Sequence, residues 1–90
     1  MRSRYTAYAV GDTAYLLSTW HATTRPRRLS LDAGLRWTGL TVLSAKGGLL
    51  DTTGVVAFQA RYDDQGRPGV LTETSRFVRE GGRWYYVGPV

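Results

Sequence analysis

The hydrophobic pattern of this chain changes its period near residue 34. Before that point apolar residues recur every three or four positions, as on the buried face of a helix, and from Leu35 to Val87 they alternate, as in a strand with one buried face. Helices followed by strands are typical of an α+β domain in which the helices cover one face of an antiparallel sheet. The 90 residues fit a single domain spanning 1–90.

Two short helices are predicted before residue 21. The first covers Met1 to Val10 and ends at Gly11, while Asp12 is a residue type that caps a helix N-terminus, so the second helix covers Thr13 to Thr19. The helical pattern starts at the first residue, so the sequence leaves open whether residues precede Met1. The side chains expected to face inward are Tyr5, Tyr8, Ala9, Tyr15, Leu16, Leu17 and Trp20.

Four strands are predicted after a loop over residues 21–34, which is rich in turn formers and has room for one helical turn. The strands cover residues 35–45, 54–62, 70–80 and 83–87. In the first strand the alternation slips by one residue near Gly39, which indicates a β-bulge and therefore a bend. Turn sequences at 63–66 and 80–82 favour hairpins between consecutive strands. A bent sheet covered by helices leaves a cone-shaped hollow between the two layers.

The composition excludes several classes of site and location. The chain has no cysteine and a single histidine, so it holds no disulfide, no zinc–thiolate site and no multi-histidine metal site within one chain. We therefore predict no metal and no cofactor. No window approaches the roughly 18–20 apolar residues of a membrane span, and the first residues lack the apolar run of a signal peptide. The prediction is a cytoplasmic protein without membrane contact.

Nine runs of residues carry a resemblance to a known family, namely residues 1–8 (MRSRYTAY), 11–12 (GD), 15–17 (YLL), 19–21, 24–26, 35–40 (LRWTGL), 58–62 (FQARY), 75–78 (SRFV) and 82–86 (GRWYY). They resemble the middle domain of the YchJ family, an uncharacterised bacterial group also called UPF0225. The resemblance covers nearly the whole chain and implies an NTF2-like fold, which is a cone of curved sheet closed by helices. It implies no reaction, because the family has none established. Typical members carry a cysteine-rich SEC-C-type segment before this domain; that segment is absent here, so no role of it is transferred.

Two titratable residues are candidates for acid–base chemistry. Glu73 alternates with Leu71 and Phe77 and should face the hollow, where an unpaired carboxylate has a raised pKa and suits a general base. The structural alternatives are an exposed strand end or an ion pair with Arg4, Arg36 or Arg61. His21 follows the second helix and would act as the partner acid or base. Its alternative is a helix-end histidine that bonds a backbone carbonyl.

Aromatic and hydroxyl side chains are candidates for binding a ligand in the hollow. Trp20, Trp37, Trp84 and Tyr86 would form an aromatic cage, and Tyr62 and Ser75 would supply hydroxyl donors. The alternatives are ordinary core packing and hydroxyls satisfied by backbone groups. The full set predicted to bind a ligand is Trp20, Trp37, Phe58, Tyr62, Glu73, Ser75, Phe77, Trp84 and Tyr86.

The net charge of +5 raises the question of phosphate or nucleic-acid binding. Basic residues are mostly scattered, and the one dense group lies around Pro26: Arg25, Arg27 and Arg28. These three are the phosphate candidates, and a solvated basic loop is the alternative. No phosphate-binding glycine motif accompanies them, which makes nucleic acid the weaker partner class. A second copy of the chain is the other candidate partner, through the outer sheet face formed by Gln59, Arg61, Thr72, Thr74 and Arg76.

Three functions remain open on the sequence alone. The favoured one is a non-catalytic accessory domain that binds a small ligand or a protein partner through its cone or sheet face, as a homodimer. The second is a small enzyme with Glu73 and His21 in the cavity. The third is nucleic-acid binding through the arginine loop over residues 25–28. The sequence names no ligand, reaction or partner.

Overall fold

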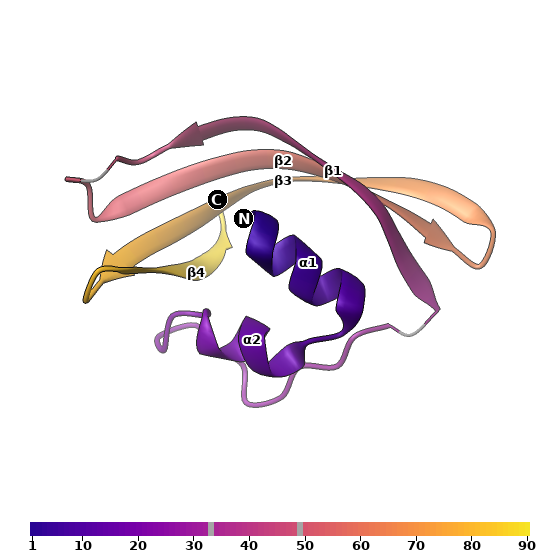
Figure 1. Ribbon diagram of the computed structural model, residues 1–90, viewed down its shortest axis with the longest axis horizontal. Coiled ribbons are helices and arrows are strands. Elements are labelled where there is room, and N and C mark those ends of the chain that lie inside the picture. Colours follow the sequence, from indigo (N-terminus) through magenta and orange to yellow (C-terminus); the bar gives the residue numbers. More distant parts are fainter. Residues whose placement is uncertain (33, 49) are drawn as a thin grey trace.

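The computed structural model describes residues 1–32, 34–48 and 50–90. Its two helices lie on the concave side of a bent sheet (Figure 1), so the predicted α+β arrangement of N-terminal helices packed on a curved antiparallel sheet is confirmed. Among the described residues, no helix has the length and apolar character needed to cross a membrane. The elements are α1 (Arg2–Val10), α2 (Thr13–Ser18), β1 (Leu35–Lys46), β2 (Thr53–Asp64), β3 (Arg67–Glu80) and β4 (Arg83–Pro89).

The boundary between the two helices lies where the sequence predicts it. Gly11 ends α1 in the left-handed conformation, with φ 76° and ψ 27°, which glycine adopts without steric cost. The side chain of Asp12 then caps α2 by accepting a hydrogen bond from the amide of Tyr15 at 3.0 Å. Together the two residues turn the chain so that α2 packs back against α1.

The inward face of α1 differs from the predicted one. Ala9 is exposed, whereas Arg4 and Ala7 are buried. The reason is that α1 has two neighbours: its Tyr5 and Tyr8 rings pack edge-on against Trp37 of β1, each at 6.2 Å, while Arg4 turns toward α2. A helix face predicted from apolar residues alone does not include Arg4, so it misses the contact between α1 and α2.

The strands form one antiparallel sheet in the order β1-β2-β3-β4, so the predicted meander is confirmed. Two-residue turns join β2 to β3 and β3 to β4. Both central residues of each turn have positive φ, namely 53° and 88° at Gln65 and Gly66, and 59° and 78° at Gly81 and Gly82. Such turns match the twist of the flanking strands. The strands are longer than predicted because pairing continues up to the turns.

Irregularities in strand pairing bend the sheet at three places. The predicted bulge is confirmed: Trp37 pairs with Tyr62 and Gly39 with Arg61, which leaves Thr38 as the extra residue. A second register shift leaves Leu43 unpaired in β1, and a third lies in β4 opposite the Arg76–Phe77 step. Because a bulge increases local twist, the three together curl the sheet around the helices.

The loop after α2 covers part of the outer edge of β4. Trp20 forms an isolated parallel bridge with Tyr86; the amide of His21 donates to the carbonyl of Tyr86 at 2.7 Å, and the amide of Tyr86 donates to the carbonyl of Thr19 at 2.8 Å. One helical turn follows, in which the amides of Thr24 and Arg25 both bond the carbonyl of His21. These bonds close the helical layer onto the sheet.

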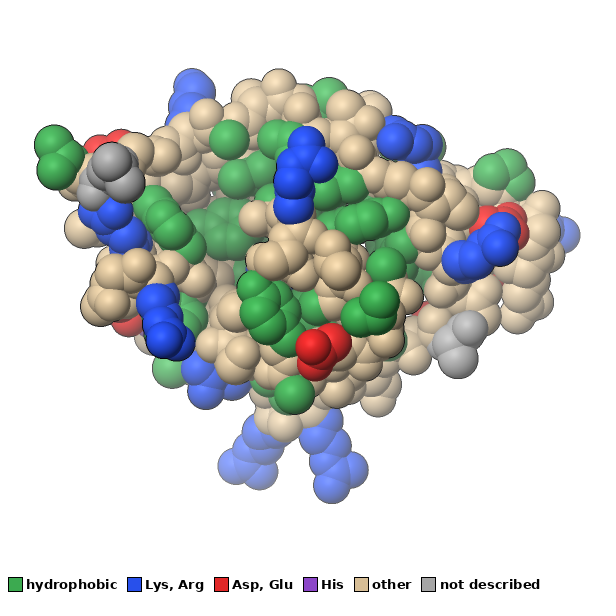
Figure 2. Space-filling view, in the orientation of Figure 1, with side chains coloured by type: hydrophobic (Ala, Val, Ile, Leu, Met, Phe, Trp, Pro, Cys, Tyr) green, Lys and Arg blue, Asp and Glu red, His purple; other side chains and the backbone are tan. Residues whose placement is uncertain are grey.

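The buried core is small and contains two polar side chains. Leu16 is fully buried, and Ala7, Phe58, Ala60 and Phe77 are between 3% and 7% exposed. Arg4 and Ser75 are buried with them, at 4% and 0%. In Figure 2, hydrophobic side chains gather between the helices and the sheet, and Lys and Arg side chains project around them. Both of these buried polar side chains line a cavity between the helices and the sheet.

Candidate functional site

Two adjoining cavities lie between the helices and the concave face of the sheet. The one that we call the inner cavity has a volume of about 170 Å³, and the end cavity, toward the tips of β1 and β2, has about 240 Å³. Arg4 and Met1 line both of them. The inner cavity is otherwise lined by Tyr5, Tyr8, Trp37, Phe58, Ala60, Leu71, Glu73, Ser75 and Tyr86.

Glu73 lies on the wall of the inner cavity, on the strand face that its alternation predicts. The hydroxyl of Ser75 donates a hydrogen bond to its Oε2 at 2.5 Å, and the Tyr86 hydroxyl lies 3.5 Å from the same oxygen. Ser75 has no exposed surface, so its hydroxyl is a buried donor that holds the carboxylate of Glu73 in place. The carboxylate therefore has a defined position at the cavity.

The three arginines considered as ion-pair partners of Glu73 are engaged elsewhere. Arg36 lies 3.8 Å from Asp63, and Arg61 donates to the Thr41 hydroxyl at 2.9 Å. Within the described parts of the chain, no ion pair joins Glu73 to Arg4 or to any other cation. The geometry therefore favours hydrogen bonding by hydroxyls over the ion-pair alternative.

Arg4 is the site residue that sequence reasoning missed, except as a partner for Glu73. Its Nη1 donates to the carbonyl of Leu16 at 3.1 Å and to the Thr19 hydroxyl at 2.8 Å, and its guanidinium lies over the rings of Tyr86 and Trp20, at 4.5 and 5.2 Å from their centroids. Burial lowers the pKa of this guanidinium, which Tyr8 and Tyr86 partly oppose. The available signal was its position three residues before Ala7 and four before Tyr8, on one helix face.

Tyr86 joins the two charged residues, because its ring face contacts Arg4 and its hydroxyl approaches Glu73. Burial and, after it, the negative charge of Glu73 raise the pKa of the Tyr86 phenol from the usual 10.0 to about 12. The phenol thus stays protonated and able to donate at neutral pH.

The raised pKa of Tyr86 predicts a loss of stability at alkaline pH. Between pH 10 and about 12 the unfolded chain ionises this phenol while the folded chain does not, so the free energy of unfolding falls as pH rises through that window. We expect the tyrosinate absorbance of the folded protein to keep rising near pH 12. In the Tyr86→Phe variant, this last step of the titration is expected to be absent. A Tyr86→Phe titration that instead lacks a component near pH 10 would contradict the assignment.

The four residues predicted to form one aromatic cage, Trp20, Trp37, Trp84 and Tyr86, do not line one cavity. Trp37 and Tyr86 line the inner cavity together with Phe58 of the predicted ligand-binding set, and Trp84 lines the end cavity together with Phe77. Trp20 and Tyr62 line neither. The Trp20 ring packs on Tyr86 at 4.9 Å, and the Tyr62 ring packs on Trp37 at 5.7 Å, so both support wall residues from behind.

His21 and Glu73 do not share a cavity. The His21 Nε2–H donates to Glu80 at 3.0 Å, and its Nδ1 accepts from the amide of Thr23 at 3.3 Å. Its ring lies edge-on to Tyr85 and lines neither the inner nor the end cavity. The hypothesis of an acid–base pair formed by Glu73 and His21 in one cavity is therefore wrong on geometry: His21 fastens the loop to the β3–β4 hairpin instead.

The basic loop and the outer sheet face lie away from both cavities. Arg25 folds back and donates through Nε and Nη2 to the carbonyl of Trp20, at 3.1 and 3.0 Å, while Arg27 and Arg28 are exposed. Their phosphate role stays a prediction. On the outer face, Gln59 is half-buried and the other four residues named above are exposed. The homodimer through that face and the cytoplasmic location likewise stay predictions.

No metal centre is formed by the described residues, since no three His, Asp or Glu side chains come together in them. The arrangement at the cavities offers a hydrogen-bond acceptor, a cation and aromatic surface. Such groups are suited to bind and orient a molecule. The Ser75 hydroxyl, which is hydrogen-bonded to the Glu73 carboxylate, has no exposed surface.

Comparisons with known proteins agree with this architecture. The family model described as YchJ, middle NTF2-like domain, matches residues 1–89. A UPF0225 protein of Streptomyces coelicolor is 55% identical over 87 residues, and one of Chromobacterium violaceum is 54% identical over 91 residues; they cover 96% and 97% of this chain, which spans 67% of each of them. The solution structure of a SEC-C motif containing protein from Rhodopseudomonas palustris superposes on this chain with a TM-score of 0.86 at 29% identity. The aligned region comprises all of this chain and 73% of that protein.

The family match, the identity to curated relatives and the shared cone all carry the same conclusion. The chain belongs to the YchJ (UPF0225) family and corresponds to its middle, NTF2-like domain.

Proposed function

We propose that this domain is a binding module whose inner cavity takes a small molecule. The observation that carries the proposal is a hydrogen-bonded carboxylate at the wall of an otherwise largely aromatic cavity. Few polar groups in an apolar hollow are the usual composition of a ligand site. A binding role fits the site better than catalysis, because His21 lies elsewhere and no histidine or second carboxylate of the described residues lines the inner cavity with Glu73.

The dimensions and polarity of the cavity define the class of ligand. Its volume of about 170 Å³ suits one ring, since an apolar cavity of ~150 Å³ is large enough for benzene. Ser75 and Tyr86 both approach Oε2 of Glu73, which leaves Oε1 to accept from a ligand donor. The proposed ligand is therefore a single-ring molecule with one N–H or O–H group directed at Glu73.

The test compares phenol with toluene, which has a similar shape but no donor. Phenol is expected to shift the backbone amide signals of Phe58, Glu73 and Ser75 in a nitrogen-15 NMR titration, and to bind about tenfold more tightly than toluene, because a hydrogen bond to a charged acceptor contributes roughly 1.5–3 kcal/mol. Equal affinity for the two probes, or shifts confined to other regions, would contradict the proposal.

A matched pair of variants locates the binding. Ala60 is buried on the cavity side of β2, and Ala57 lies on the opposite face of the same strand. Ala60→Val fills part of the cavity and is expected to weaken phenol binding about tenfold, since overpacking costs ~1–3 kcal/mol. Ala57→Val adds the same two methyl groups outside the cavity and is expected to leave phenol affinity unchanged.

A further inference from the structure

The guanidinium of Arg4 is buried without a carboxylate partner. Arg4 is 4% exposed, yet its contacts are a carbonyl, a hydroxyl and the faces of two aromatic rings, all of them uncharged. No described carboxylate lies within ion-pair distance of it. Glu73 instead accepts from the hydroxyls of Ser75 and Tyr86, and Arg4 covers the ring face of that tyrosine. Buried charges in proteins are normally paired, because desolvation penalises an isolated ion.

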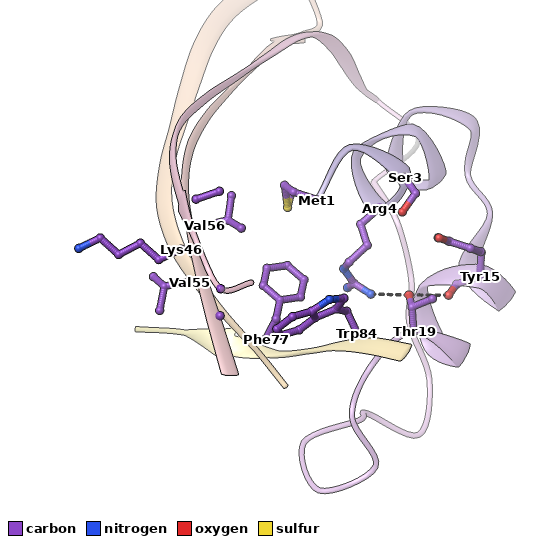
Figure 3. A pocket seen from close by; sticks show the side chains of 13 residues that line it. Met1, Ser3, Arg4, Tyr15, Thr19, Lys46, Val55, Val56, Phe77 and Trp84 are labelled. Atoms are coloured by element: carbon purple, nitrogen blue, oxygen red, sulfur yellow. Dashed lines mark hydrogen bonds between the residues drawn. The ribbon is translucent and has the colours of Figure 1, made fainter. Parts of the chain in front are cut away.

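The end cavity gives the Arg4 guanidinium access to a ligand. In Figure 3 the guanidinium lies at the cavity beside Phe77 and Trp84, and a hydrogen bond to Thr19 holds it in place. Thr19 in turn donates to the carbonyl of Tyr15 at 2.8 Å, so the cation is fixed to α2 from behind. An anion that enters the end cavity therefore meets a positioned guanidinium.

The rest of the end cavity is largely apolar. Val56 projects into it from β2, and the rings of Phe77 and Trp84 lie below, as Figure 3 shows. Lys46 belongs to the lining, but its ammonium group extends away from the cavity in the same view. Among the side chains that line the cavity, Arg4 thus supplies the one cation directed into it, and the hydrocarbon wall is large enough, at about 240 Å³, for a ring and a short side group.

We propose that the end cavity binds a small organic carboxylate, whose carboxylate group pairs with Arg4 and whose apolar part packs against Val56, Phe77 and Trp84. A guanidinium presents parallel N–H donors that match the two oxygens of a carboxylate. One monovalent cation suits a monoanion, and the apolar wall disfavours a fully hydrated ion such as inorganic phosphate. This site adjoins the proposed phenol site, with which it shares Arg4 and Met1, but the proposal does not depend on phenol binding.

The experiment compares phenylacetate with 2-phenylethanol, its uncharged analogue, on the folded 90-residue chain. Binding is followed through the indole N–H signals in NMR, among which the signal of Trp84 is expected to shift, and through the combined fluorescence of the three tryptophans. Phenylacetate is expected to bind roughly 10- to 100-fold more tightly than 2-phenylethanol, because hydrogen bonds between charged groups are the stronger ones. Arg4→Met is expected to remove this preference, and Arg4→Lys to restore part of it.

A second pair of variants keeps the test valid if Arg4→Met fails to fold. Val56→Phe fills the end cavity and is expected to weaken phenylacetate binding at least tenfold. Val70→Phe places the same ring on the exposed outer face of the sheet, where Val70 pairs with Arg61 and lines neither cavity, and is expected to have no effect. Ala60→Val tests the inner cavity alone, so loss of phenol binding with retained phenylacetate binding separates the two proposals.

Three outcomes would overturn the proposal. One is equal affinity for phenylacetate and 2-phenylethanol. Another is an unchanged preference in folded Arg4→Met. The third is displacement of phenylacetate by millimolar inorganic phosphate, which would show that the site selects anions without regard to their apolar part.

Discussion

Replacement of Leu16 by alanine is expected to lower the free energy of unfolding by about 3 kcal/mol. Leu16 is the fully buried residue of α2, a helix of six residues that is too short to be stable without its tertiary contacts. Buried Leu→Ala changes cost ~2–5 kcal/mol through lost transfer energy and the cavity left behind. In a domain of this size each kcal/mol shifts the melting temperature by ~4–8 °C, so a decrease of more than about 10 °C is expected.

The measurement is urea-induced unfolding followed by circular dichroism, with Leu50→Ala as the matched control. Leu50 is 96% exposed, so the same chemical change there should cost less than about 0.5 kcal/mol. If the two variants lose equal stability, α2 does not contribute to the core as described. The test also bears on the end cavity, because the carbonyl of Leu16 holds Arg4.

The local signals in the sequence were sufficient to predict the order of elements and their principal turns. Gly11 and Asp12 act through their own backbone and side chain, so their effect is independent of the rest of the molecule. The glycine at position 39 likewise marked the first bulge. The alternation in β3 predicted the side of the sheet on which Glu73 and Ser75 lie, because the period of a strand fixes the face of every residue.

Features that depend on contacts between distant segments could not be predicted in this way. The second bulge, at Leu43, has no glycine or other local marker in the sequence. It is visible only in the pairing of β1 with β2, where the register shifts between Val42 and Ser44. The burial of Arg4 requires α2 to fold back so that Leu16 and Thr19 accept its hydrogen bonds. An arginine on an amphipathic helix is ordinarily read as solvent-exposed, so its burial emerges only with the tertiary fold.

The same limit explains the error over His21. Sequence position placed it after α2, at the exit of the cone, but alternation and helical period say nothing about how a loop crosses a sheet edge. The bonds to Tyr86 and Glu80 direct the ring to the far side of β4. The sequence therefore predicts which face of the sheet a residue within one strand lies on. Whether two residues from different segments come together can be seen only in the folded structure.

Phe58→Ala is expected to be the most damaging single substitution in the chain. Phe58 is 4% exposed at the middle of β2, where it pairs with Val42 on one side and Glu73 on the other. Loss of a buried phenylalanine side chain costs ~3–5 kcal/mol. Because the stability of native proteins is only about 5–15 kcal/mol, the variant is expected to be largely unfolded at moderate urea concentrations.

Phe58→Leu separates the structural role of this residue from its role in the cavity. Leucine keeps most of the buried area, so a cost of roughly 1 kcal/mol is expected and the protein should remain folded. Its smaller side chain widens the inner cavity beside Glu73, and phenol is therefore expected to bind more weakly, with fewer contacts to its ring, while the tyrosinate titration of Tyr86 is retained. Equal stability of Phe58→Ala and the wild type in urea would mean that the concave face of β2 is not the core, and the cavity that it walls would then have no fixed shape in which to hold a ligand.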